Sequence, residues 1–311
     1  MGRSTWRLHA GEGAWALWRI LKKARWDAVD QALKGDASLG VSKVCKAAGM
    51  SRQNHYKQRR RREALEVDEA VVVELVDEVR RTHPRMGARK ILGLLDKPME
   101  EKGVSMGRDR MFDLLRSRDR LVKRYPRTKR TTQSRHSLPV FGNRIRDLKP
   151  TGPDQVWVAD LTYLRTTEGF VFLALVMDAW SRKIVGSHVS SSLESQGCQE
   201  ALQEALKGLR AGGGKPIHHS DRGCQYCCHA YVQKLQENGL GISMTEEMHC
   251  YENGKAERVI GTLKWEYGLD GIRATKADWV RAVEEAIRAY NEQRPHNGIQ
   301  GRIPAQMHAT G

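Results

Sequence analysis

Three carboxylates stand where an acidic side chain could take part in chemistry. Asp160 lies inside the apolar segment WVADLTYL, Asp221 ends the short apolar segment PIHHSD, and Glu257 lies in the helix-like segment ENGKAERVIGTLKWE. An ionised carboxylate within an apolar strand is costly to bury unless a cation satisfies it. These residues are therefore candidate metal ligands, provided that the fold brings them together.

Simpler explanations exist for the same residues. An Asp followed closely by Gly is ordinary turn chemistry, so Asp221 could merely end a strand, with Gly223 letting the backbone turn sharply. Sixty residues separate Asp160 from Asp221 and thirty-five separate Asp221 from Glu257, but with 37 acidic residues such a spacing can arise by chance. The surrounding elements are more informative than the spacing.

The chain from residue 154 onward predicts a mixed α/β domain. The segments QVWVADLTYLR, FVFLALVMDAW and KIVGSHVS are short, apolar and rich in Val, Phe and Trp, and they favour three consecutive strands. A helix, a strand (PIHHSD), a helix, a strand (GISMT) and two helices follow. This order is that of a ribonuclease-H-like fold with a mixed five-stranded sheet and flanking helices. In that fold, the first strand, the end of the fourth strand and a late helix converge on one edge of the sheet.

The net charge is divided unevenly along the chain. Residues 1–150 hold 36 Lys and Arg against 18 Asp and Glu, whereas residues 151–311 hold 17 against 19. The whole basic excess therefore lies in the first half. Such asymmetry indicates a module that binds a polyanion, here nucleic acid, joined to a second part.

The basic half is predicted to contain two all-α DNA-binding regions, residues 1–62 and 63–122, and a basic linker, residues 123–153. In the first region a helix broken at Gly49 precedes a basic helix with Ser51 as N-cap, the outline of a helix-turn-helix. The second helix of that motif enters the major groove. The candidate DNA contacts are Arg52, Gln53, Asn54, His55, Arg59 and Arg60 there, and Arg108 and Arg110 in the second region.

Several ordered motifs resemble one known family. WVADLTYL, HSDRGCQY, ENGKAERVIGTLKWE and the terminal YNEQRPHNGIQGRIPAQMH, together with HPRMGARKI, are similar to the large catalytic frame of bacterial insertion-sequence transposases that move through circular intermediates. These belong to the DDE, retroviral-integrase-like superfamily. The resemblance covers about residues 38–308.

The resemblance implies a metal-binding catalytic triad of Asp160, Asp221 and Glu257. It implies two Mg²⁺ ions, for which Mn²⁺ can substitute, and carboxylate oxygens suit such hard cations. Lys264 lies seven residues after Glu257 and Asn253 four before it, so both share the face of Glu257 in a helix and are expected to contact DNA.

The function implied is that of an enzyme, a DNA transposase. It would bind the terminal inverted repeats of its element and target double-stranded DNA, and cleave and transfer strands with Mg²⁺, acting as a homo-oligomer. The alternative class is a DNA-binding regulator that has kept the fold without the chemistry. A general ribonuclease H is disfavoured by the basic first half.

Cysteine use and hydropathy fit an intracellular protein. The longest apolar run, FVFLALVM, is too short to span a membrane, and we identify no signal peptide, so we expect a bacterial cytoplasmic, nucleoid-associated protein with reduced thiols. A zinc site is a competing interpretation of the crowded His and Cys residues at 218–229. It lacks a second ligand pair, because only Cys250 follows nearby.

Overall fold

The computed structural model describes residues 26–36, 39–122, 138–209, 214–246 and 253–311, and the first part of the expected basic linker, residues 123–137, lies outside these ranges. Contacts divide the chain into two compact units, Met1–Val73 and Glu74–Gly311. Among the described residues, no helix combines the length and the hydropathy needed to cross a membrane.

The first unit has the predicted helix-turn-helix outline. Residues 26–35 are helical, α2 spans Val41–Ala47, and α3 begins at Arg52. The turn between α2 and α3 contains Gly49 with a left-handed φ of 63°, which glycine adopts without steric cost. Ser51 Oγ accepts the backbone N–H of Asn54 at 3.1 Å, which confirms Ser51 as the N-cap.

Helix α3 is longer than the sequence pattern suggested. It runs without a break over Arg52–Thr82, so the expected boundary between residues 62 and 63 falls within it. Its C-terminal part belongs to the second unit, together with α4 (Ala88–Glu101) and α5 (Arg108–Ser117). The apolar stripes of these helices bury Val72, Val76, Ile91 and Leu115.

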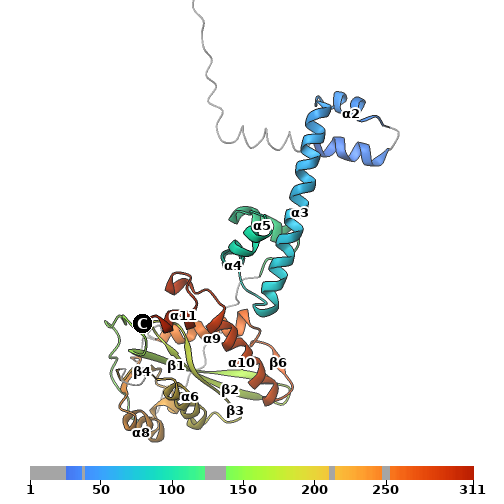
Figure 1. Ribbon diagram of the computed structural model, residues 1–311. Coiled ribbons are helices and arrows are strands. Elements are labelled where there is room, and N and C mark those ends of the chain that lie inside the picture. Colours follow the sequence, from blue (N-terminus) through green and yellow to red (C-terminus); the bar gives the residue numbers. More distant parts are fainter. Residues whose placement is uncertain (1–25, 37–38, 123–137, 210–213, 247–252) are drawn as a thin grey trace, which may run out of the picture. The chain divides into compact units, whose positions relative to one another are not determined.

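The remainder of the second unit is built on one mixed sheet (Figure 1). The strands are β1 (Val156–Thr166), β2 (Phe170–Asp178), β3 (Ile184–Ser190), β4 (Ile217–Ser220), β5 (Gly241–Met244) and β6 (Ile272–Arg273). Their order is β3-β2-β1-β4-β5, with β6 paired to the end of β1. β1–β3 form the antiparallel meander and β4 runs parallel to β1, as the predicted ribonuclease-H-like fold requires. The two-residue β6 is an addition to the five strands expected.

Helices cover both faces of the sheet because apolar side chains alternate along β1. Val156, Val158 and Leu164 face one core, which α9 (Gly254–Glu266) and α10 (Lys276–Glu292) complete. Trp157 and Ala159 face the other core, with α6 (Ser195–Lys207) and α8 (His229–Glu237). The short elements α7 (Cys224–Cys227), η2 (Asn297–Ile299) and α11 (Pro304–Ala309) complete the unit. β1 is thus fixed from both sides, which makes it a rigid support for Asp160.

Candidate active site

The register between β1 and β4 accounts for the spacing of the two aspartates. Val156 pairs with Ile217, Trp157 with His218, and Val158 with His219 in this parallel pair. The same offset carried two residues further sets Asp221, just after β4, opposite Asp160. Residues opposite one another in parallel strands project from the same face, and for Asp160 this is the face of Val158, which α9 covers. The two carboxylates are therefore neighbours across adjacent strands.

The three predicted carboxylates lie within electrostatic range of one another, as the raised pKa values of the two aspartates indicate. Burial, with the charges of Asp221 and Glu257, raises the pKa of Asp160 to about 8, against the opposing effects of the Leu161 N–H and Lys264. Burial and the charge of Glu257 also raise the pKa of Asp221, although the Gly223 N–H opposes this. These opposing groups compensate the repulsion only in part, and a bound cation would relieve the remainder.

Helix α9 brings Glu257 to the aspartates because its first turn is tied to β1. Asn253, the N-cap residue, is only 3% exposed and its Nδ2 donates to the carbonyl oxygen of Ala159 at 3.0 Å. Ala159 immediately precedes Asp160. The Asn253 side chain therefore lies in the interior, against the strand that carries the first aspartate.

Lys264 lies further along α9 and also faces this site. Burial lowers its pKa, while the charge of Asp160 acts in the opposite direction. In turn, Lys264 acts to lower the pKa of Asp160. A half-buried cation thus lies within electrostatic range of the carboxylates.

Gly223 follows Asp221 for a reason other than the one expected. Its φ of −63° is accessible to any residue, so the turn does not need glycine's conformational freedom. The space around it is tight, because a Cβ at this position would lie 3.0 Å from Asp221 Oδ1 and 3.2 Å from Gln225 Oε1, so a larger residue would displace the Asp221 carboxylate by a few tenths of an ångström. The Gly223 N–H donates to Asp221 Oδ1 at 3.0 Å, which orients the carboxylate.

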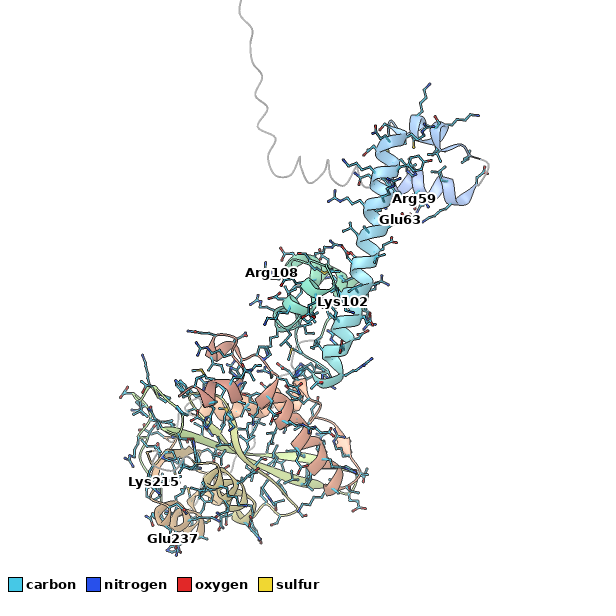
Figure 2. The ribbon with its side chains drawn as sticks, in the orientation of Figure 1. Arg59, Glu63, Lys102, Arg108, Lys215 and Glu237 are labelled. Carbon is cyan, nitrogen blue, oxygen red and sulfur yellow. The ribbon has the colours of Figure 1, made fainter. Side chains whose placement is uncertain are left out.

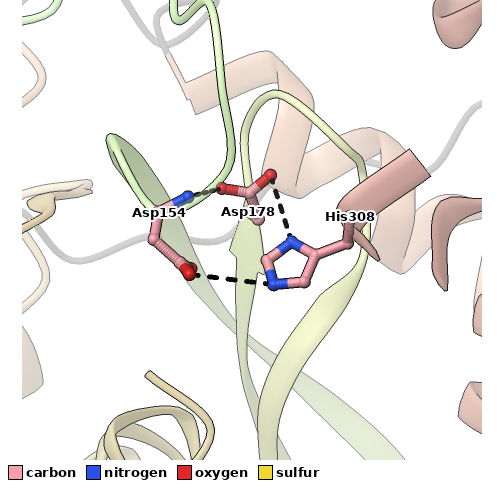
Figure 3. A group of neighbouring side chains, drawn as sticks. All are labelled: Asp154, Asp178 and His308. Atoms are coloured by element: carbon pink, nitrogen blue, oxygen red, sulfur yellow. Dashed lines mark hydrogen bonds and ion pairs between the residues drawn. The ribbon is translucent and has the colours of Figure 1, made fainter. Parts of the chain in front are cut away.

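A second acidic cluster, Asp154, Asp178 and His308, was missed by sequence reasoning (Figure 3). Among the described residues it is the one group of three whose ligand atoms lie within 4.8 Å of one another, so the predicted triad is more widely spread. Asp178 is already satisfied by the Ser181 N–H (2.7 Å), the Ser181 hydroxyl (2.6 Å) and the Asp154 N–H (2.9 Å).

The two ring nitrogens of His308 face different carboxylates. Nε2 lies 3.8 Å from Asp154 and Nδ1 lies 3.8 Å from Asp178. Because Asp178 already accepts three hydrogen bonds and the ring bridges the two carboxylates, we interpret the cluster as a structural tie between α11 and the segments that carry Asp154 and Asp178. No pattern in DAWSRK or PAQMH indicates this contact, because it forms between distant segments.

The crowded cysteines do not form a zinc site among the described residues. Cys227 Sγ contacts Met244 Sδ at 3.6 Å, and Cys228 Sγ donates to the carbonyl oxygen of Gln225 at 3.3 Å. His218 Nε2 instead lies 3.0 Å from the hydroxyl of Tyr231. Within the described ranges no three of these His and Cys side chains gather as ligands, and Cys250 falls outside those ranges.

The residues of the first unit that are expected to contact DNA differ in how far their side chains are exposed to solvent. Arg52 and Gln53 are exposed at the start of α3, and Asn54 is half-buried. His55 is 2% exposed and stacks on Trp26 at 5.7 Å between ring centroids, so it belongs to the core of this unit.

The arginines further along the helices are accessible. Arg59 and Arg60 are exposed on α3, and Arg59 pairs with Glu63 at 2.8 Å (Figure 2). In the second unit, Arg108 is exposed at the first position of α5 and pairs with Asp109 at 2.9 Å, whereas Arg110 is half-buried.

Two family models match the second half of the chain. Both are described as an integrase core domain, and they match residues 150–250 and 238–304. The matched ranges together include Asp160, Asp221, Glu257 and Lys264.

Solved structures show limited similarity. The catalytic core domain of HTLV-2 integrase in complex with magnesium is 20% identical, with a TM-score of 0.41, over 51% of this chain and 99% of that one. The simian T-cell lymphotropic virus intasome in complex with the PP2A regulatory subunit B56 gamma is 15% identical, with a TM-score of 0.44, over 72% of this chain and 70% of that one.

Curated relatives come from insertion elements. The IS600 uncharacterized 31 kDa protein of Shigella sonnei is 34% identical over 267 residues, which cover 84% of this chain and 96% of that protein. Transposase InsF for insertion sequence IS3A of Escherichia coli K12 is 38% identical over 175 residues, 55% of this chain and 60% of that protein. The chain therefore belongs to the DDE transposases of bacterial insertion sequences, which are polynucleotidyl transferases with an integrase catalytic core.

Proposed function

We propose that this transposase binds the terminal inverted repeats of its own element and catalyses Mg²⁺-dependent strand cleavage and strand transfer. The observation that carries the proposal is the convergence of Asp160, Asp221 and Glu257 from β1, the end of β4 and α9. Three carboxylates this close, two of them with raised pKa values, are a donor set for divalent cations.

The residues present fit a magnesium centre. Asp160, Asp221 and Glu257 would hold the metal with hard carboxylate oxygens, and the resemblance to the family implies two ions. Bound there, the ions would activate the attacking oxygen and stabilise the leaving oxygen of the phosphodiester. Mn²⁺ has the same preference for oxygen ligands and should substitute.

The chain's own groups orient the reaction. Asn253 fixes the start of α9 against Ala159, and the Gly223 N–H holds the Asp221 carboxylate. Lys264 would place its ammonium against a DNA phosphate beside the carboxylates. Asn253 is buried, so we assign it a positioning role in place of the DNA contact expected from its helical face.

Terminus recognition is assigned to the helical regions. The exposed residues Arg52 and Gln53 at the N-terminal end of α3 have the donor geometry that reads guanine and adenine edges in the major groove. Arg59, Arg60 and Arg108 would neutralise phosphates, and Asn54 and Arg110 remain candidates at half-buried positions. We leave His55 out of this set because it is buried.

Joining two element ends requires that both be held together, so we propose that a dimer or larger homo-oligomer assembles on DNA. Its substrate would be nucleoid DNA in the bacterial cytoplasm. Mass photometry of the full chain, with and without a terminal-repeat duplex, measures the number of protein copies in each complex. A complex that stays monomeric on paired ends would contradict it.

The experiment that tests the function uses the full chain and a duplex carrying the element's terminal repeat. Mg²⁺ should support nicking at the element end and joining of the freed 3′-hydroxyl, and EDTA should abolish both. A scrambled duplex of the same length controls for sequence recognition. Tight terminus binding without cleavage in Mg²⁺ or Mn²⁺ would identify a DNA-binding regulator.

A further inference from the structure

The segment HPRMGARK, residues 83–90, comprises the loop 83–87 between α3 and α4 and the first turn of α4, and it contacts the last turn of α9 within the second unit. His83 is 3% exposed, and its Nδ1 lies 3.0 Å from the hydroxyl of Tyr267, the residue that ends α9, at a sequence separation of 184. Their rings meet edge to face at 5.7 Å between centroids. A loop of the helical region thus packs on the helix that carries Glu257.

Arg85 caps the C-terminal end of α9. Its backbone N–H donates to the carbonyl oxygen of Glu266 at 3.2 Å, and its guanidinium donates to that of Trp265 at 3.3 Å. The last carbonyls of a helix have no partner within the helix, and a cation beside them is favourable. The helix is therefore terminated by a residue far away in sequence.

Arg85 also reaches Lys264 through one intermediate residue. Its Nη1 lies 3.1 Å from both carboxylate oxygens of Asp270. The Asp270 N–H donates to the carbonyl oxygen of Lys264 at 3.2 Å, and the Asp270 charge acts to raise the pKa of Lys264. Arg85 thus holds a carboxylate that acts on the cation of the candidate active site.

Glu266 ties the same turn to two further segments. It accepts Lys90 Nζ at 2.9 Å, and Arg294 Nε and Nη2 at 2.7 and 2.8 Å. Burial acts to raise the pKa of Glu266, but the hydrogen bonds and charges of Arg294 and Lys90 outweigh it and the pKa is lowered. Breaking a buried network of this kind leaves a charge without its partner, which is strongly destabilising.

We infer that residues 83–90 form a clamp that positions α9 for phosphoryl transfer, with Arg85 as the positioning residue for Lys264. The clamp consists of His83, Arg85 and Lys90 on one side and Glu266, Tyr267 and Asp270 on the other. The inference rests on the proposed function. Under this inference, residues 83–90 position the active-site helix for strand transfer. Without it, a basic segment in a DNA-binding region would be interpreted as a contact to DNA phosphate.

The test compares Arg85→Ala with Arg89→Ala in the full chain. Arg89 is exposed on the same segment, so its removal costs the same charge without disturbing α9. Arg85→Ala should slow single-turnover strand joining by about 10- to 100-fold, the effect of a misplacement on the order of 1 Å. Arg89→Ala should join at the wild-type rate, and both should bind the terminal repeat equally well.

Two further variants exclude a merely structural role. Arg85→Lys keeps the charge beside Asp270 but loses the planar fork, so it should rescue part of the joining rate. In a double-mutant cycle, Arg85→Ala should slow a Lys264→Ala enzyme by less than it slows wild type, because both changes act through one group. Fully additive effects, or equal losses in the Arg85 and Arg89 variants, would overturn the inference.

Hydrogen exchange separates failure of the clamp from failure of the proposed function. The amides of the last turn of α9 should exchange faster in Arg85→Ala than in wild type or Arg89→Ala, whether or not strands are joined. Wild-type protein that joins no strands would remove the proposed function. Unchanged exchange in Arg85→Ala would remove the clamp itself.

Discussion

Asp160 is the residue at which stability and function oppose one another. Its pKa of about 8, raised by burial and by Asp221 and Glu257, exceeds its value in an unfolded chain. For a carboxyl with a raised pKa, the folded state loses stability as pH rises from about 4 through 8. At neutral pH the metal-free folded protein therefore keeps Asp160 largely protonated, whereas the unfolded chain ionises it, and this difference lowers the free energy of unfolding.

We predict that Asp160→Asn raises the melting temperature in EDTA while it abolishes strand cleavage. The amide keeps the shape and the acceptor for the Leu161 N–H but has no proton to release on unfolding, so the stability that the raised pKa of Asp160 removes is recovered. Each kcal/mol gained should appear as about 2–4 °C in a thermal melt. Asp96→Asn, at an exposed position of α4, is the control and should change neither property. A melting temperature below wild type would contradict the repulsion described for Asp160.

Lys264→Ala should reduce strand transfer more than it reduces terminus affinity or thermal stability. One phosphate contact is a small part of a large basic interface, whereas misplacement of the reacting strand can cost on the order of 100-fold in rate. Lys264→Arg should keep much of the activity, because the role requires a cation. Lys276→Ala, at an exposed position of α10, is the matched control. Single-turnover joining at the wild-type rate in Lys264→Ala would leave this residue without a role in the reaction.

At the level of the elements, strand β4 and the clamp (residues 83–90) each contain a buried, neutral histidine, His218 and His83. Burial is the main cause that lowers the pKa of His218 to about 3 and that of His83 to about 4. The unfolded chain takes up these protons near pH 6.5. Because it binds more protons than the folded state in this window, the free energy of unfolding should fall as pH falls from about 6.5 towards 4.

Urea melts at a series of pH values measure this slope. His83→Asn should flatten the slope, at the cost of the contact with Tyr267. His229→Asn, at an exposed position, should leave the slope unchanged. A slope in His83→Asn as steep as that of wild type would show that His83 is protonated in the folded protein.

The elements also show what a sequence can predict. The apolar strand segments of β1–β3 and the apolar periodicity of the helices were sufficient to predict the sheet and the helices that flank it, because these are local patterns in the sequence. β6, two residues long, and the tie of His308 to Asp154 and Asp178 depend on contacts between distant segments, so no local pattern marks them. The neighbourhood of Asp160 and Asp221 follows from strand register, which spacing alone could not establish.

At the scale of the whole molecule, the basic first half should dominate the salt dependence of DNA binding. Each neutralised phosphate contributes about −0.9 to the slope of log K against log salt concentration. Arg59→Ala and Arg60→Ala should therefore each make this slope shallower by about 0.9, the contribution of one phosphate contact. Gln53→Ala should instead lower discrimination against a mutated repeat by about 1–3 kcal/mol. Arg281→Ala, at an exposed position of α10, is the control. Equal losses of slope in the Arg281 variant would contradict the assignment of DNA binding to the helical regions.

Asp160, Asp221 and Glu257 should together form one metal centre for strand cleavage. Its most direct test is single-turnover cleavage of a terminal-repeat duplex by the full chain in Mg²⁺, with Asp160→Asn, Asp221→Asn and Glu257→Gln compared at equal DNA occupancy. Each variant keeps the shape of the side chain and removes the charge that holds the cation. We predict that all three lose cleavage while they bind the repeat as wild type does. Cleavage at the wild-type rate by any one of them would remove that residue from the centre and contradict the account.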